Sequence, residues 1–187
     1  MVLNLPNIIT LARGLLIPVF ILFFYIDLPA APYIALGVFI VAGATDWLDG
    51  YLARRYNKVT TLGKFIDPLA DKLLVVSACV MLAASGLMHP VAVIIVTARE
   101  LVVTTLRVVA MSKGVVLAAD KSGKIKTAVQ IVCIALMLAP FVAEVSFALF
   151  GIDIALTLAL AVITAAVTLW SGADYMIKNA YLFKEQE

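Results

Sequence analysis

The sequence predicts an all-α integral membrane protein with six transmembrane helices. Hydrophobic residues make up 64% of its 187 residues and charged residues only 14%, whereas soluble domains contain roughly 45–50% and 25%. The hydrophobic residues gather in blocks of about 20, the length of helix that crosses a hydrocarbon core of ~30 Å. Proline and glycine turns separate several of these blocks. A water-soluble fold is therefore excluded, and we expect one membrane domain over residues 1–187.

Turn residues and basic segments set the limits of each predicted helix. The first two runs are divided by a segment with prolines at both ends, Pro29 and Pro32, and the third and fourth by Gly86 and Pro90. The second and third runs, and the fourth and fifth, are divided by lysine-containing loops, and Gly151 precedes the sixth. Proline and glycine disfavour helix propagation. The predicted spans are residues 8–26, 33–54, 65–87, 90–111, 125–145 and 152–176.

The basic residues predict the orientation in the membrane. If six helices cross the membrane in alternating directions, the Lys and Arg residues fall at one side of it. The loops at the opposite side contain no Lys or Arg, and their charged residues are Asp27, Glu144 and Asp153. By the positive-inside rule, both termini are cytoplasmic. We expect a multi-pass protein of the inner (cytoplasmic) membrane with its active site facing the cytosol. A net charge of only +2 gives no indication of a nucleic-acid partner.

Four aspartates inside the predicted helices are the strongest functional signal. Asp46 and Asp49 lie near the cytoplasmic end of the second span, and Asp67 and Asp71 lie near the start of the third. Spacings of three and four residues place each pair on one helix face. Ionisable residues within a span are costly and are functional candidates by default. We therefore expect two antiparallel helices to direct four carboxylates into one pocket.

Four adjacent carboxylates require protons or divalent cations. Because the ligands are oxygens without His or Cys, the sequence favours a hard ion such as Mg²⁺ or Mn²⁺, and four carboxylates exceed what one ion requires. The alternative is ordinary ion pairing with nearby basic residues. That alternative leaves unexplained the small residues Gly50, Ala53 and Gly63, which let a ligand or a backbone approach closely.

These residues carry a resemblance to a known family. The pattern Asp46-x2-Asp49-Gly50-x2-Ala53-Arg54-x8-Gly63-x3-Asp67-x3-Asp71 is similar at every fixed position to that of the CDP-alcohol phosphatidyltransferase family. The resemblance implies transfer of a phosphatidyl group from CDP-diacylglycerol to an alcohol, with release of CMP. It implies that the four aspartates bind two divalent cations, Mg²⁺ or Mn²⁺, and that Asp71 also acts as the catalytic base. Membrane lipids and a second copy, forming a homodimer, are the other expected partners.

The same resemblance suggests residues that bind the nucleotide lipid. Gly50, Ala53 and Gly63 would admit the cytidine nucleotide, and Arg54 would hold the diphosphate. Asn7, Thr10 and Arg13 form a polar edge on the first span. We include Asn7 and Thr10 in the CDP-diacylglycerol site, whereas Arg13 either reaches lipid head groups or contacts a phosphate.

A second group of basic residues predicts an anionic acceptor. Arg99 and Arg107 enter the apolar fourth span, and Lys124, Lys126 and Thr127 open the fifth. A helix N-terminus together with lysine and arginine can receive a phosphate. These blocks resemble those of family members that use sn-glycerol 3-phosphate, so we assign all five residues to the acceptor site.

Other interpretations remain open at this stage. Inositol phosphate, serine or phosphatidylglycerol could replace glycerol 3-phosphate, and a cation transporter or a lipid-binding protein could also carry acidic helices. We interpret Glu100 as a residue that orients Arg99 or Arg107. We interpret Trp47, Trp170, Tyr175 and Tyr181 as interfacial anchors.

Overall fold

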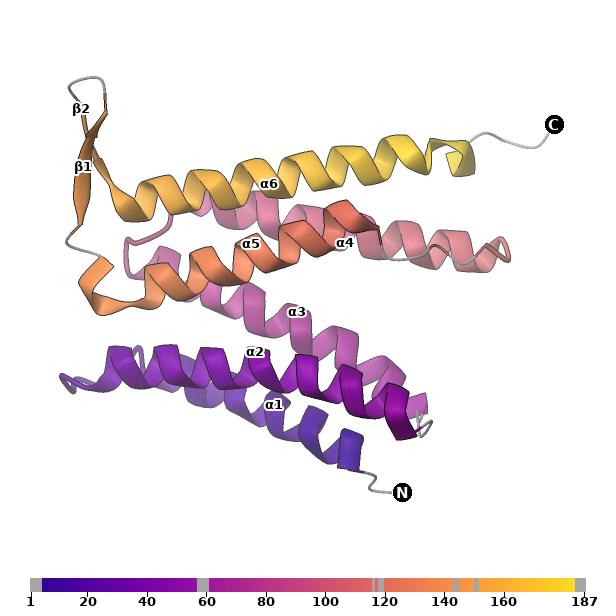
Figure 1. The fold of residues 1–187 in the computed structure, drawn as a ribbon, viewed down its shortest axis with the longest axis horizontal. Coiled ribbons are helices and arrows are strands. Elements are labelled where there is room, and N and C mark those ends of the chain that lie inside the picture. The colour runs from indigo at the N-terminus through magenta and orange to yellow at the C-terminus, as the bar shows by residue number, and fades with distance from the viewer. Residues whose placement is uncertain are drawn as a thin grey trace.

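The computed structural model describes residues 5–56, 61–115, 117, 120–142, 145–149 and 152–183. Over these residues the chain forms six α-helices, two short 3-10 helices and one β-hairpin (Figure 1). The helices are α1 (Leu5–Leu22), α2 (Ala31–Tyr56), α3 (Thr61–Ala84), α4 (Pro90–Ser112), α5 (Lys121–Leu138) and α6 (Leu156–Lys178), the strands are β1 (Ser146–Leu149) and β2 (Ile152–Ala155), and the 3-10 helices are η1 (Pro140–Val142) and η2 (Ala180–Phe183).

The hairpin between α5 and α6 differs from the predicted all-helical chain. Strands β1 and β2 pair antiparallel, with Ser146 opposite Ala155 and Leu149 opposite Ile152. The fifth helix ends at Leu138, before Pro140, and the sixth begins only at Leu156. A short apolar run has no periodicity that separates strand from helix. The helix limits near residues 145 and 152 were therefore wrong, although the number of α-helices over the described residues is as predicted.

Local sequence explains where α4 begins and where α3 and α4 end. Pro90 takes the first position of α4, where its missing N–H costs nothing, and the His89 side chain accepts a hydrogen bond from the Val91 N–H at 3.3 Å. Gly86 and Gly114 have φ angles of 74° and 75°, the left-handed conformation that commonly follows a helix. The Leu87 and Val115 N–H groups then bond back to Leu82 and Ala110 carbonyls, each at 2.9 Å.

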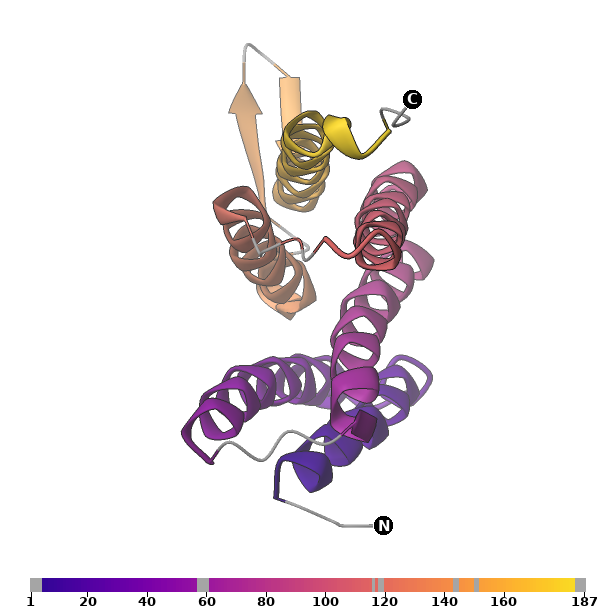
Figure 2. The same cartoon turned by 90° about the vertical axis from the view of Figure 1, so that its right-hand side faces the viewer.

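The helices pack as two groups of three that share a core. Helix α1 contacts α2 and α3, and α6 contacts α4 and α5, while α3 touches α4 and α2 touches α5 (Figures 1 and 2). Phe20 is fully buried and meets Phe24 edge-on at 5.2 Å between ring centroids. Leu82, Ile134 and Met137 extend this core to α3 and α5. The packing brings both described ends of the chain to one end of the bundle and the hairpin to the other.

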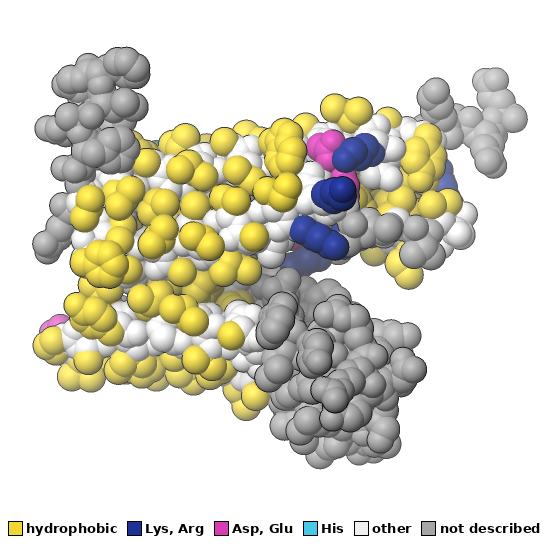
Figure 3. Space-filling model, viewed as in Figure 1, with side chains coloured by type: hydrophobic (Ala, Val, Ile, Leu, Met, Phe, Trp, Pro, Cys, Tyr) yellow, Lys and Arg dark blue, Asp and Glu magenta, His cyan; other side chains and the backbone are white. Residues whose placement is uncertain are grey.

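The outer surface of the bundle is rich in hydrophobic side chains. Each helix exposes some of them, and hydrophobic atoms cover most of the face seen in Figure 3. On that face, the described Lys and Arg side chains gather toward the end that carries the chain termini. Among the described residues, α6 alone is both long and apolar enough to cross a membrane, and shorter apolar stretches occupy Ala12–Leu22, Ala31–Thr45 and Lys72–Ala84. The arrangement is consistent with a helical membrane family.

Candidate functional site

Helices α2 and α3 bring the acidic motif to one end of the bundle. Asp46 and Asp49 lie in the second half of α2, and Asp67 and Asp71 lie in the first half of α3. The two helices are consecutive, run in opposite directions and contact each other. The backbone therefore places all four residues toward the end of the bundle at which α1 begins and α6 ends (Figure 1).

The motif side chains lie outside the part of the structure that is described, so their contacts stay predictions. This applies to the residues predicted for the donor site: Asp46, Asp49, Gly50, Ala53, Arg54, Gly63, Asp67, Asp71, Asn7 and Thr10. The backbones of all ten belong to α1, α2 or α3. The structure thus brings the predicted donor residues into one three-helix group, without describing how their side chains meet.

Arg13 is a buried cation in the same three-helix group. Its side chain is completely inaccessible, although α1 is otherwise apolar around it. Helix α1 packs against both aspartate-bearing helices. A buried guanidinium is costly unless negative charge or hydrogen bonds compensate it. Full burial argues against the interpretation of Arg13 as a side chain that reaches the lipid head groups.

Glu100 is the centre of a charged cluster between α4, α5 and α6. Its Oε1 accepts a hydrogen bond from Arg99 Nη1 at 3.1 Å and another from Lys126 Nζ. The Lys126 side chain is only 4% exposed, and those of Arg99 and Glu100 are 11% and 16% exposed. Arg99 Nη2 also donates to Ser171 Oγ at 2.9 Å. Two residues predicted for the acceptor site, Arg99 and Lys126, are therefore held together by one carboxylate.

Two glycines make room for Arg99. A Cβ atom added to Gly172 would lie 3.1 Å from Arg99 Cγ, and one added to Gly123 would lie 3.7 Å from Arg99 Nη2. The arginine side chain thus occupies space that these glycines leave between α5 and α6. Gly172 thus serves packing within the chain. Ser171 and Gly172 were missed as neighbours of the site, although Ser171 is a polar residue within an apolar run.

A second contact connects this cluster to α3. Lys72 Nζ donates a hydrogen bond to Thr104 Oγ1, and Thr104 Oγ1 donates to the Glu100 carbonyl at 2.6 Å. Lys72 is also close enough to interact electrostatically with the Glu100 carboxylate. Because Lys72 directly follows Asp71 in the sequence, the contact ties the aspartate-bearing helix to α4.

The other three predicted acceptor residues are exposed. Arg107 Nε donates to Tyr175 Oη at 3.2 Å, and its guanidinium lies 5.6 Å from the centre of the Tyr175 ring. Lys124 is exposed on the first turn of α5, and Thr127 uses its hydroxyl to bond the Gly123 carbonyl at 3.0 Å. Tyr175 itself is 3% exposed, so its interpretation as an interfacial anchor was wrong. It packs inside the bundle and orients Arg107.

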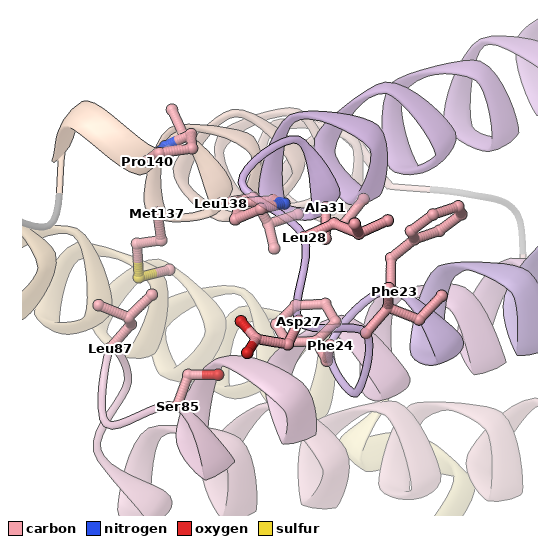
Figure 4. A pocket seen from close by; sticks show the side chains of 14 residues that line it. Phe23, Phe24, Asp27, Leu28, Ala31, Ser85, Leu87, Met137, Leu138 and Pro140 are labelled. Atoms are coloured by element: carbon pink, nitrogen blue, oxygen red, sulfur yellow. The ribbon is translucent and has the colours of Figure 1, made fainter.

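A pocket of about 380 Å³ lies at the opposite end of the bundle (Figure 4). Its walls come from the loop between α1 and α2, the loop between α3 and α4, and the end of α5. Asp27 and Ser85 are the polar side chains among otherwise apolar ones such as Phe23 and Met137. None of the predicted site residues is among the described residues that line it.

Comparison with known proteins now identifies the family. The model of the CDP-alcohol phosphatidyltransferase family matches residues 3–170, which include all four motif aspartates and the Glu100 cluster except Ser171. The chain belongs to the CDP-alcohol phosphatidyltransferase family. The match spans α1 to α5 and most of α6, so family membership applies to the bundle as a whole.

Curated relatives of this phosphatidyltransferase are similar over almost the whole chain. A protein of Bacillus subtilis (strain 168) is 41% identical over 189 residues, covering 94% of this chain and 95% of the relative. Proteins of Escherichia coli (strain K12) and Shigella flexneri serotype 5b (strain 8401) are 38% identical, covering 92% of this chain and 93% of each relative. All three are named CDP-diacylglycerol–glycerol-3-phosphate 3-phosphatidyltransferase.

An ion pair outside the apolar region joins the loop before α5 to the end of α6. Lys178 Nζ lies 2.7 Å from both Asp120 Oδ2 and Asp174 Oδ2. Asp120 also caps α5, accepting a hydrogen bond from the Lys121 N–H at 2.6 Å. The bond from Lys178, followed by that from the Lys121 backbone, lowers the pKa of Asp120 from 3.8 to about 2. A depressed folded-state pKa stabilises the fold above the unfolded value and ceases to do so as the pH falls through the folded value.

Replacement of Asp120 should therefore lower stability in a pH-dependent way. At pH 7 we expect Asp120→Asn to unfold at a lower temperature than the parent in detergent, because the cap and the ion pair are weakened. The difference should shrink as the pH falls from about 4 to about 2. Asp27→Asn, which removes a carboxylate at the opposite end, is the matched control. If the difference in unfolding temperature between the parent and Asp120→Asn stays constant over this pH range, the lowered pKa of Asp120 is contradicted.

Proposed function

We propose that this phosphatidyltransferase moves a phosphatidyl group from CDP-diacylglycerol to sn-glycerol 3-phosphate, giving phosphatidylglycerophosphate and CMP. The observation that carries the proposal is the extent of similarity to relatives named for this reaction, 38–41% identity over more than nine tenths of both chains. The aspartate motif on two contacting antiparallel helices supports the same chemistry.

Asp46, Asp49, Asp67 and Asp71 would hold two divalent cations, Mg²⁺ or Mn²⁺. The donor set fits such ions, because all four ligands are hard carboxylate oxygens and come from two helices in contact. When bound, the cations neutralise the diphosphate and the charge that develops on the departing CMP. Arg13, buried on the adjoining helix, adds a fixed positive charge to the same region.

The remaining motif residues would bind the nucleotide end of CDP-diacylglycerol. Gly50, Ala53 and Gly63 leave space along α2 and α3, and Arg54 at the end of α2 would pair with the diphosphate through its fork of donors. Asn7 and Thr10, in the first turns of α1, would contact the same substrate from the neighbouring helix.

Asp71 would act as the base that accepts the proton of the primary hydroxyl of glycerol 3-phosphate. The hydroxyl oxygen then forms a bond to the phosphorus attached to diacylglycerol. The bond from that phosphorus to the oxygen shared with the cytidine phosphate breaks, and CMP leaves with the shared oxygen. Such a transfer depends mainly on positioning and charge neutralisation.

The phosphate of glycerol 3-phosphate would bind to the basic side chains of α4 and α5. Arg107 and Lys124 are exposed and can meet a phosphate from the aqueous side, with Thr127 nearby on α5. Arg99 and Lys126 are more deeply buried and form the inner wall together with Glu100. Bidentate arginine donors and a helix N-terminus are suited to binding a phosphate dianion.

In the membrane, we place α1 to α6 as six spans with both termini and the active site at the cytoplasmic face of the inner membrane. This placement is supported by the apolar outer surface and by the gathering of basic side chains at the end that carries both termini (Figure 3). CDP-diacylglycerol would then enter from the bilayer and glycerol 3-phosphate from the cytosol. The family resemblance also leads us to propose a homodimer.

An acceptor panel tests the proposed reaction. CMP release from CDP-diacylglycerol is measured with the purified protein in detergent, with Mg²⁺ or Mn²⁺, using glycerol 3-phosphate, inositol 1-phosphate, serine and phosphatidylglycerol. We expect release with glycerol 3-phosphate that EDTA abolishes, because the carboxylate cluster requires its cations. If CMP is released only with another alcohol, glycerol 3-phosphate is not the acceptor. If no alcohol gives CMP release, a transporter or a lipid-binding protein is favoured.

Removal of the proposed base tests the site directly. Asp71→Asn should lower turnover by at least about 100-fold, since general base catalysis typically contributes 10²- to 10⁴-fold. The variant should keep the thermal unfolding temperature of the parent, measured in detergent. Near-normal turnover in a folded variant would exclude Asp71 as the base.

A further inference from the structure

The Glu100 cluster contains more positive than negative charge. Three cations from three helices surround one carboxylate: Lys72 of α3, Arg99 of α4 and Lys126 of α5. Each side chain is partly or fully buried. Buried cations that are close together repel each other, and the shared carboxylate offsets this repulsion. Glu100 therefore determines where these cations can lie.

The contacts of Glu100 also fix the direction of the Arg99 and Lys126 side chains. Its Oε1 binds both Lys126 Nζ and Arg99 Nη1, while Ser171 holds the opposite guanidinium nitrogen of Arg99 at 2.9 Å. Gly172 leaves room for the aliphatic part of Arg99, because a Cβ atom at this position would lie 3.1 Å from Arg99 Cγ. Lysine and arginine have many rotamers, so these contacts restrict both side chains before any ligand binds.

We propose that Glu100 is a positioning residue of the acceptor site, which holds Arg99 and Lys126 in place for the phosphate of the acceptor. This inference rests on the proposed function and adds to it a residue that need not touch either substrate. The chain of contacts from Glu100 through Thr104 to Lys72 links the acceptor side to α3, beside Asp71. These contacts pass through the backbone carbonyl of Glu100, so they join its position on α4 to the helix that carries the residue proposed as the base.

Glu100→Gln tests this role, because glutamine keeps the size of the side chain and removes its charge. We expect KM for glycerol 3-phosphate to rise about 10- to 100-fold, the loss that a small displacement of positioning groups can cause. KM for CDP-diacylglycerol should change less than twofold. Glu100→Asp, which keeps the charge on a shorter side chain, should recover part of the loss.

One control variant and one further test variant separate positioning from a structural role. Asp27→Asn removes one carboxylate from the opposite end of the bundle and should leave both KM values unchanged. Ser171→Ala removes one contact of Arg99 without changing any charge, and should raise KM for glycerol 3-phosphate by a few fold. This second variant keeps the test decisive if Glu100→Gln does not fold.

The outcomes distinguish this inference from the proposed reaction. If the parent protein does not use glycerol 3-phosphate, the proposed function fails before any variant is compared. If the parent uses it, equal KM values in parent and Glu100→Gln would overturn the positioning role. A lower KM for glycerol 3-phosphate in Glu100→Gln would also overturn it, because the carboxylate would then only weaken the attraction between the basic residues and the phosphate. An equal rise in KM for both substrates would overturn it as well. When Glu100→Gln does not fold, an unchanged KM in Ser171→Ala has the same meaning.

Discussion

The cost of placing charge inside an apolar helix bundle governs this structure. Arg13, Lys126 and Glu100 lie within helices whose outer faces are hydrophobic, and each is buried or largely buried. Such groups persist only where opposite charges, hydrogen bonds or ligands compensate them. Glu100 supplies this compensation within the second group of helices. In the first group, we propose that two divalent cations compensate the four aspartates.

The two groups of helices divide the proposed reaction between them. The residues proposed for the donor site belong to α1, α2 and α3, and those proposed for the acceptor site belong to α4 and α5. The contact from Lys72 to Thr104 joins the two groups beside Asp71. Catalysis by positioning requires that both substrates be held in a fixed relation. A charged contact between α3 and α4 is therefore well placed to maintain that relation.

Much of this arrangement is predictable from sequence. The aspartate motif identified the family, and the four aspartates lie on the second and third helices as predicted. The hairpin was not predictable, since segments as short as residues 146–149 and 152–155 show no periodicity that separates strand from helix. Glu100 was predicted to orient Arg99 or Arg107, and it contacts Arg99. The contact of Arg99 with Ser171 and the burial of Tyr175 against Arg107 were not predictable, because each joins positions about 70 residues apart. Periodicity within one helix says nothing about which neighbour packs against it.

The path of a single oxygen atom tests the central claim most directly. Glycerol 3-phosphate carrying ¹⁸O at its primary hydroxyl is supplied together with CDP-diacylglycerol in ordinary water, and the lipid product and CMP are analysed by mass spectrometry. If the acceptor hydroxyl attacks the phosphatidyl phosphorus, all of the label appears in the phosphodiester of the lipid and none in CMP. Label in CMP, or an unlabelled lipid product, would contradict the account.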